Sequence, residues 1–156
     1  MLNRRQLILA AGATALAPVA AQASIFGAKG PIFTRRGRAI RGTDPVAYFT
    51  QGGPVEGMEN HSTEWMGALW LFASAENREA FEMNPRAYAP QYGGYCAWAV
   101  SNDYTASTDP DAWRIVDGKL YLNYSKGVQR RWEQDVPGNI QRGDANWPNI
   151  LEGLRA

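Results

Sequence analysis

The chain has 156 residues, with 16 Lys or Arg and 15 Asp or Glu, so its formal net charge is only +1. Nucleic-acid-binding domains usually carry a basic excess on one face, and this near-neutral balance argues against that class. Six Trp and seven Tyr in a chain that is 45% hydrophobic are sufficient for one core of ordinary domain size.

The N-terminal segment has the three parts of a secretory signal peptide. Arg4 and Arg5 precede an apolar run that starts at Leu7, and residues 21–23 (Ala-Gln-Ala) form a small-x-small cleavage site. The run is too short and too rich in alanine for a membrane span. Adjacent arginines are typical of twin-arginine export, with an ordinary signal peptide as the alternative. We expect residues 1–23 to be removed, leaving a soluble periplasmic or secreted protein without a membrane span.

Residues 24–37 mix Gly, Pro and basic residues, which predicts a linker or arm whose Ile32 and Phe33 dock on the domain. Residues 38–156 are the expected domain. In its first half, apolar runs, capping residues and prolines predict the elements. They are a short strand at 39–42, a buried turn at 46–49, a short edge strand at 55–58, a buried strand at 68–72, a helix at 75–83 capped by Ser74, and one helical turn at 85–89.

The clearest local pattern is residues 117–118, Asp-Gly between two apolar runs, which is typical of a two-residue hairpin turn. We detect no internal repeat in the sequence. The order of elements predicts an α+β fold, a small antiparallel sheet with a β-hairpin packed with short helices. In the second half the elements are a polar loop at 101–111, strands at 113–116 and 119–122, a helix from the Ser125 cap through Asp135, and closing helical turns after Pro137.

Cys96 is the only cysteine, and it follows two glycines and Tyr95 in an apolar, aromatic segment. Because no second cysteine exists, an exported chain cannot pair it internally. We expect a strand in which Cys96 and Trp98 share a face, with the thiol shielded from solvent and directed into an aromatic-lined cavity. Free cysteine is also among the most buried residue types, so a plain core role is the alternative.

A metal site is one interpretation of Cys96. His61 is the only histidine, and Met58 and Met66 lie near it in the chain. Thiolate, thioether and imidazole ligands together suit copper, whereas a structural zinc site usually takes four Cys or His ligands. The predicted metal ligands are therefore Cys96, His61, Met58 and Met66, and the alternative is that His61 bonds within a loop while the methionines pack.

A ligand pocket is a second interpretation of the aromatic residues. Tyr48, Tyr92, Tyr95 and Trp98 are mostly core candidates, and several of them could line a pocket for a small ligand. A Cys–His pair could also serve as nucleophile and base. No nucleophile elbow, phosphate loop or metalloprotease helix is present in the sequence, so an enzyme is the less favoured interpretation.

Three ordered motifs resemble the YHS-domain family, and its exported, stand-alone branch in particular. They are residues 44–49 (Asp-Pro-Val-Ala-Tyr-Phe), 70–77 and 84–97, and the resemblance extends over roughly residues 38–151. YHS domains occur beside copper and heavy-metal transport modules, and they resemble small metal-binding domains that use cysteines. Those relatives often carry Cys where this chain has Ala47 and Ala73 or Ser74, so a two-cysteine metal site is not implied here.

The sequence therefore predicts an exported YHS-like domain that binds a metal, with copper favoured, or a small ligand near Cys96. One alternative is a non-catalytic structural or interaction module in which Cys96 is part of the core. A further alternative is a thiol-dependent redox protein. The implied partner is a metal ion or small ligand, and no nucleic acid is expected.

Overall fold

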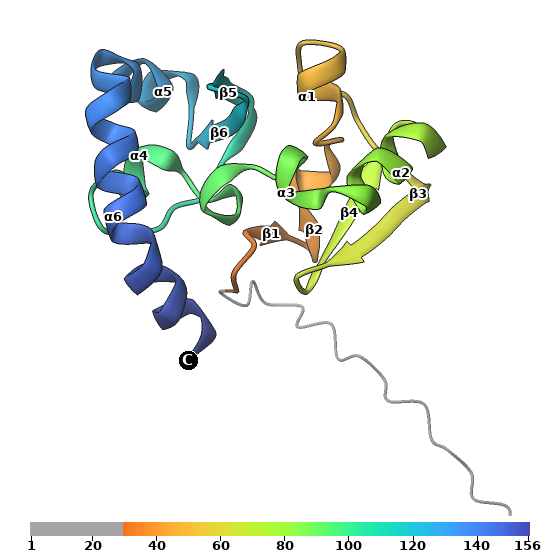
Figure 1. Ribbon diagram of the computed structural model, residues 1–156, viewed down its shortest axis with the longest axis horizontal. Helices are drawn as coiled ribbons and strands as arrows, with labels where there is room; N and C mark the ends of the chain where they lie inside the picture. Colours follow the sequence, from red (N-terminus) through yellow and green to blue (C-terminus); the bar gives the residue numbers. More distant parts are fainter. Residues whose placement is uncertain (1–29) are drawn as a thin grey trace, which may run out of the picture.

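The computed structural model describes residues 30–156, so the predicted signal peptide and the first part of the arm lie outside it (Figure 1). Three short 3-10 turns cover Ile40–Gly42, Gln91–Gly94 and Glu133–Asp135. The helices and strands are β1 (Thr34–Arg35), β2 (Arg38–Ala39), α1 (Ala47–Thr50), β3 (Met58–Trp65), β4 (Ala68–Phe72), α2 (Ala75–Met83), α3 (Pro85–Tyr88), α4 (Ala97–Ser101), β5 (Asp109–Val116), β6 (Lys119–Asn123), α5 (Lys126–Trp132) and α6 (Val136–Arg155).

The predicted α+β class is confirmed. A four-stranded sheet has the order β1-β2-β4-β3, and β5 pairs with β6 in a separate two-stranded sheet. The pairings are antiparallel apart from β2 with β4, where Arg38 lies opposite Leu69 in parallel register. The predicted hairpin around residues 117–118 and the helix at 75–83 are both present.

Several predicted boundaries were wrong. The strand expected at 39–42 is mostly a 3-10 turn, because Ile40 and Arg41 have positive φ angles that a strand excludes. The loop expected at 101–111 already contains the start of β5 at Asp109. The edge strand expected at 55–58 is reduced to an isolated bridge between Thr43 and Glu56, since β3 begins only at Met58.

The arm is part of the fold wherever it is described. Ile32 is only 6% exposed and belongs to the main core cluster, while the Phe33 N–H donates to the Gly93 carbonyl at 2.8 Å. Gly93 has φ +60°, and a Cβ there would collide with the carbonyl oxygen of Pro31. Glycine at this position therefore allows the arm to approach the backbone closely.

The structure contains an internal repeat. Its two hairpins, β3–β4 and β5–β6, have the same register: Trp65 opposes Ala68 as Val116 opposes Lys119, and each of the other pairs is also displaced by 51 positions. Both hairpins interrupt the register at the same point, between Met58 and Ser62 and between the equivalent positions 109 and 113. The prediction that no repeat exists was wrong.

The repeat extends on both sides of the hairpins. After each hairpin a serine caps a helix: the Ser74 hydroxyl accepts from the Asn77 N–H at 3.1 Å, and the Ser125 hydroxyl accepts from the Val128 N–H at 3.2 Å. Before each hairpin, three consecutive residues have positive φ, at 40–42 and at 92–94. We call residues 40–83 the first unit and residues 92–132 the second unit.

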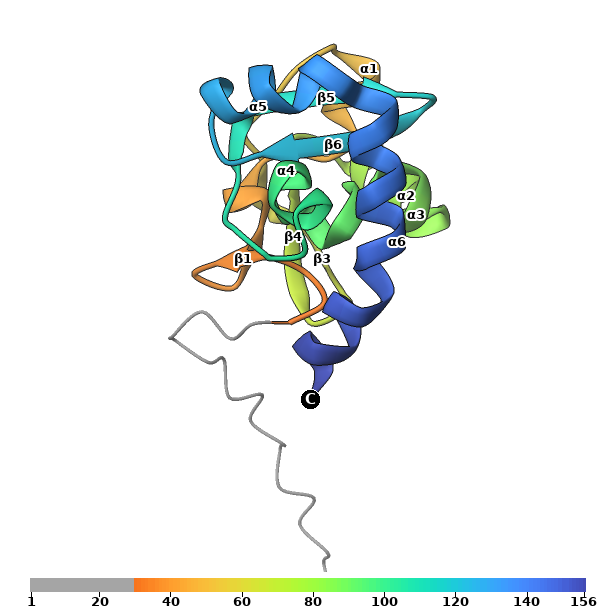
Figure 2. The same cartoon turned by 90° about the vertical axis from the view of Figure 1, so that its left-hand side faces the viewer.

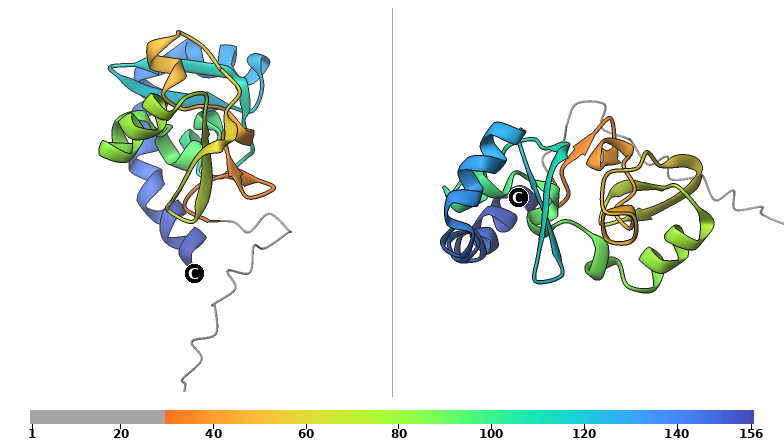
Figure 3. Two further views of the ribbon diagram at one scale, coloured as in Figure 1. Left: turned by 90° about the vertical axis from the view of Figure 1, so that its right-hand side faces the viewer. Right: turned by 90° about the horizontal axis from the view of Figure 1, so that it is seen from above.

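The two units lie side by side, with the first on the right and the second on the left of Figure 1, and Figure 3 shows the same arrangement from above. Strands β1 and β2 complete the sheet of the first unit. In the second unit the position equivalent to Arg38 of β2 is Pro90, which has no N–H for strand pairing. The second unit is instead covered by α6, which Figure 2 shows running along its outer side beyond the sheets. Within residues 30–156, no helix has the length and apolar character that a membrane crossing requires.

Candidate ligand-binding site

Cys96 is buried, with only 1% of its surface exposed. Its Sγ accepts the Tyr124 N–H at 3.3 Å, and its S–H is directed at the Asn123 Oδ1 at 3.7 Å. Burial raises the pKa of the thiol, while the backbone amides of Ala99, Tyr124 and Trp98 act in the opposite direction more weakly. The thiol is therefore shielded as predicted, but it is directed at Asn123 and not into the predicted aromatic-lined cavity. A raised pKa and low access make it a poor nucleophile.

The predicted strand at Cys96 was wrong, because the residue immediately precedes helix α4. Short apolar runs do not distinguish a strand from a buried helix, and here the positive-φ turn at 92–94 redirects the chain into a helix. The alternation of bulk at residues 95–98 therefore places no pair of side chains on one face of a sheet.

The repeat explains what Cys96 does. Its counterpart in the first unit is Asp44, which is 0% exposed. One Asp44 oxygen accepts from the N–H groups of Val46 and Ala47, and the other accepts from the Ala73 N–H at 2.8 Å. Ala73 follows β4 as Tyr124 follows β6, so carboxylate and thiol connect the same two segments in their units. This geometry places Cys96 at a structural junction.

Cys96 lies in a different part of the molecule from the other three predicted metal ligands. His61 and Met58 belong to β3 in the first unit, and Met66 lies in the turn that follows it. Cys96 precedes α4, which lies in the opposite half of Figure 1. Within residues 30–156, no group of three or more His, Cys, Asp or Glu side chains is arranged to hold a metal ion.

The four predicted pocket aromatics are also dispersed. The Tyr48 hydroxyl donates to the Pro110 carbonyl at 2.8 Å, and the Tyr95 hydroxyl donates to the Gly30 carbonyl at 2.8 Å. Trp98 is half-buried beneath the Arg131 guanidinium, 5.8 Å from its ring centroid. Tyr92 alone of the four lines the pocket described next.

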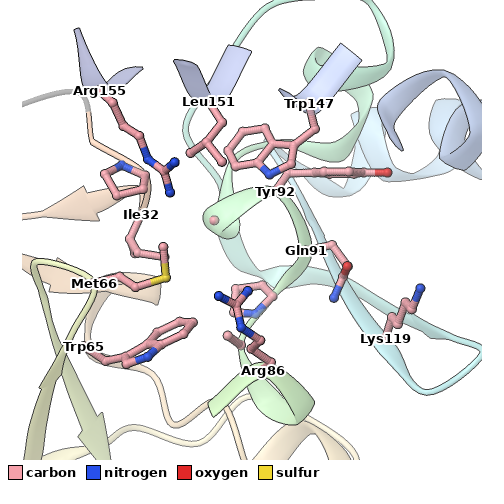
Figure 4. A pocket seen from close by; sticks show the side chains of 14 residues that line it. Ile32, Trp65, Met66, Arg86, Gln91, Tyr92, Lys119, Trp147, Leu151 and Arg155 are labelled. Carbon is pink, nitrogen blue, oxygen red and sulfur yellow. The ribbon is translucent and has the colours of Figure 1, made fainter. Parts of the chain in front are cut away.

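A pocket of about 480 Å³ lies between the two units, and we call it the inter-unit pocket. Trp65 and Met66 reach it from the end of the β3–β4 hairpin, and Trp147 reaches it from α6. Figure 4 shows the two tryptophans on opposite sides of the cavity. Its volume falls within the range typical of small-molecule sites, roughly 300–1,000 Å³.

The Tyr92 ring is held firmly in the wall of this pocket. Its hydroxyl donates to the Asp144 Oδ1 at 2.9 Å, and its ring contacts that of Trp147 with centroids 5.8 Å apart. Burial, followed by the Asp144 carboxylate, raises the pKa of Tyr92 far above its usual value. Tyr92 therefore serves as a rigid neutral surface rather than as a proton donor.

The charged side chains at the inter-unit pocket are all cationic. Arg86, Lys119 and Arg155 line it, and the lining includes no Asp or Glu. None of the three takes part in a salt bridge within residues 30–156. In Figure 4 the guanidinium groups of Arg86 and Arg155 enter the cavity from opposite walls, while Lys119 lies at the side. Such a lining attracts anions.

The lining also lacks the groups that most enzymes use for covalent or acid–base chemistry. It includes no Cys, His, Ser, Thr, Asp or Glu, and its titratable residues besides the arginines are Tyr92 and Lys119. Nucleophile–base pairs require such side chains within hydrogen-bonding reach of one another. The lining therefore offers apolar, aromatic and cationic contacts to a bound molecule.

Sequence reasoning missed most of this pocket. From the sequence, Trp65 was assigned to no element or site. Residues 66–67 were not recognised as a hairpin turn, although both have positive φ. Trp147 lies in a helix, as the closing helical turns predicted after Pro137 require, but nothing in the sequence assigned it to a pocket. A repeat search that aligned residues 66–67 with 117–118 could have located the turn, but no sequence signal brings α6 beside it.

Comparison of the chain with protein-family models, curated proteins and solved structures finds no match. The YHS resemblance therefore stays a prediction that rests on the motifs at 44–49, 70–77 and 84–97.

Proposed function

We propose that this protein is a non-catalytic binding module that holds one small, flat organic ligand in the inter-unit pocket. The observation that carries the proposal is the pair Trp65 and Trp147, two half-buried tryptophans from separate parts of the fold on opposite sides of one cavity. Tryptophan can provide a large apolar face together with a polar edge, which suits it to contact aromatic ligands.

The chemistry of the lining supports binding without reaction, since nucleophilic and carboxylate side chains are missing from it. The cysteine is occupied elsewhere, at the junction between α4 and the end of β6. A small-ligand site near Cys96 is therefore replaced in this proposal by one in the inter-unit pocket, and no observation favours copper.

The family and the cellular location that we propose depend on the sequence alone. The YHS-like motifs and the signal-peptide pattern of residues 1–23 support an exported domain that meets its ligand outside the cytoplasm. A preformed cavity on a small domain fits such a role, since most small-molecule sites are largely formed before the ligand arrives.

The test uses N-phenyl-1-naphthylamine, a neutral aromatic probe whose fluorescence rises in apolar sites. We expect saturable, one-to-one binding by the full chain. Trp147→Leu should weaken it about three- to tenfold, the range expected for loss of one aromatic contact. The matched control is Trp98→Leu, which changes another half-buried tryptophan outside the pocket and should leave the affinity unchanged.

Both variants need circular dichroism and a urea midpoint, because Trp147 also contacts the rings of Tyr92 and Tyr95. Met66→Ala provides a second, milder change in the same wall, and it should also weaken binding. Absence of saturable binding, or equal loss in the Trp147 and Trp98 variants, would contradict a ligand site between the units.

A further inference from the structure

We propose that the inter-unit pocket selects an aromatic monocarboxylate, with the carboxylate held between the guanidinium groups of Arg86 and Arg155. This inference rests on the proposed function and adds the chemical class of the ligand. The two arginines come from separate elements, α3 and α6, and their side chains enter the cavity from opposite walls (Figure 4).

Charge is the first argument. Arg86, Lys119 and Arg155 give the pocket three cationic side chains and no acidic one. Since none of these cations has a salt-bridge partner among residues 30–156, their charge is available to a bound ligand. A neutral aromatic molecule would use the tryptophan walls but would leave this charge unused.

The geometry of the donors is the second argument. A guanidinium presents planar, paired N–H donors that match the two oxygens of a carboxylate. Arg86 and Arg155 can therefore bind one carboxylate from two sides, while the ring attached to it contacts Trp65 and Trp147 in the same cavity.

A phosphate fits this site less well. Phosphate sites usually combine backbone N–H donors with a helix N-terminus. Here two of the lining residues, Pro31 and Pro90, have no N–H. Helix α6 presents its C-terminal end, where Arg155 lies, and Arg86 belongs to α3, a helix of only four residues. The partial negative charge of a helix C-terminus repels each negative charge of a ligand, so it opposes a dianion about twice as strongly as a monoanion. These features favour a monoanion over a dianion.

The experiment compares 2-naphthoate with 2-naphthamide, which has the same shape without the charge, by titration calorimetry on the full chain. We expect naphthoate to bind roughly tenfold or more tightly, as charge-assisted hydrogen bonds imply. Arg86→Gln and Arg155→Gln should each remove most of this preference while leaving the binding of naphthamide intact. Because both side chains are exposed, neither change should unfold the protein.

The matched control is Arg130→Gln, an exposed arginine on α5 that lies outside the pocket, and it should preserve the preference. Equal affinity for the two naphthalenes would overturn the carboxylate assignment and leave the proposed function standing. Tighter binding of 2-naphthyl phosphate, or a preference that survives both pocket substitutions, would also overturn it. Failure of both compounds to bind would remove the proposed function as well.

Discussion

The two units of this protein have the same backbone arrangement, but different side chains stabilise it. Both consist of a positive-φ turn, a short helix, a hairpin of identical register and a serine-capped helix. At the junction of these parts the first unit has Asp44 and the second has Cys96. A carboxylate and a thiol can therefore occupy the same structural position, because both accept backbone N–H groups.

The comparison also shows how each unit completes its core. The first adds β1 and β2 to its hairpin, while the second is covered by α6 and keeps a two-stranded sheet. An isolated two-stranded hairpin is only marginally stable in water, so a covering element is required. Helices α4 and α5 pack against the hairpin, and α6 packs on α4 and supplies Trp147 and Arg155 to the inter-unit pocket.

The largest expected effect tests whether the units are energetically equivalent. Phe81 and Trp132 occupy the same position in the helices of the two units, and both are 0% exposed. Replacing either with Ala should lower the free energy of unfolding by about 4 kcal/mol, through lost burial and a cavity. Urea denaturation measures both values. A cost below half of this for one of them would show that the core cluster to which it belongs contributes less to the stability of the fold.

The next effect separates the two junctions. Asp44→Ala leaves several buried N–H groups without an acceptor, and we expect a loss of about 3 kcal/mol. Cys96→Ala should cost only about 1–2 kcal/mol, since a thiol accepts hydrogen bonds weakly. Chemical denaturation of the two variants gives the difference. A loss of stability in Cys96→Ala that equals or exceeds the loss in Asp44→Ala would contradict the roles assigned to the two side chains.

The third effect is the pH dependence of the stability that Cys96 contributes to the second unit. Burial raises the pKa of Cys96 in the folded chain. Above the ordinary thiol pKa, roughly 8.5, the unfolded chain loses a proton that the folded chain retains. The free energy of unfolding should therefore fall as pH rises towards the folded pKa, by at most about 1.4 kcal/mol per pH unit.

Cys96→Ala is the control for this measurement, and it should be nearly flat between pH 8 and pH 9.5. At higher pH both proteins should lose stability, because burial also raises the pKa of Tyr121 to about 12 and raises that of Tyr95. A wild-type curve that coincides with the variant would mean that the thiol ionises alike in the folded and unfolded chains.

The smallest effect concerns the hairpin turns. Met66 and Asp117 occupy the same turn position, with φ of 51° and 49°. Asparagine tolerates this conformation well, whereas an unbranched apolar residue adopts it rarely. Met66→Asn should raise the free energy of unfolding by about 0.5 kcal/mol, and Asp117→Asn should change it little. Thermal unfolding would show whether the Met66 turn is in fact the strained one.

Local sequence determined the elements that depend on neighbouring residues alone. The Asp117-Gly118 turn, the Ser74 cap and the proline that ends α2 each act within four residues, and each was predicted with its correct place. Capping and turn preferences work through hydrogen bonds and φ angles of adjacent residues, so one chain segment contains the necessary information. The α+β class follows from the order of these elements.

Tertiary structure decided the repeat, the junction and the pocket. Positions 51 apart share few identical side chains, so the common register of the hairpins appears only when the backbone is folded. The equivalence of Asp44 and Cys96 cannot be seen in the sequence either. Both side chains accept a backbone N–H at the same place in their units, but the residue types differ. The inter-unit pocket requires α6 and residues 65–66 to line the same cavity, and no local preference encodes this arrangement of distant segments.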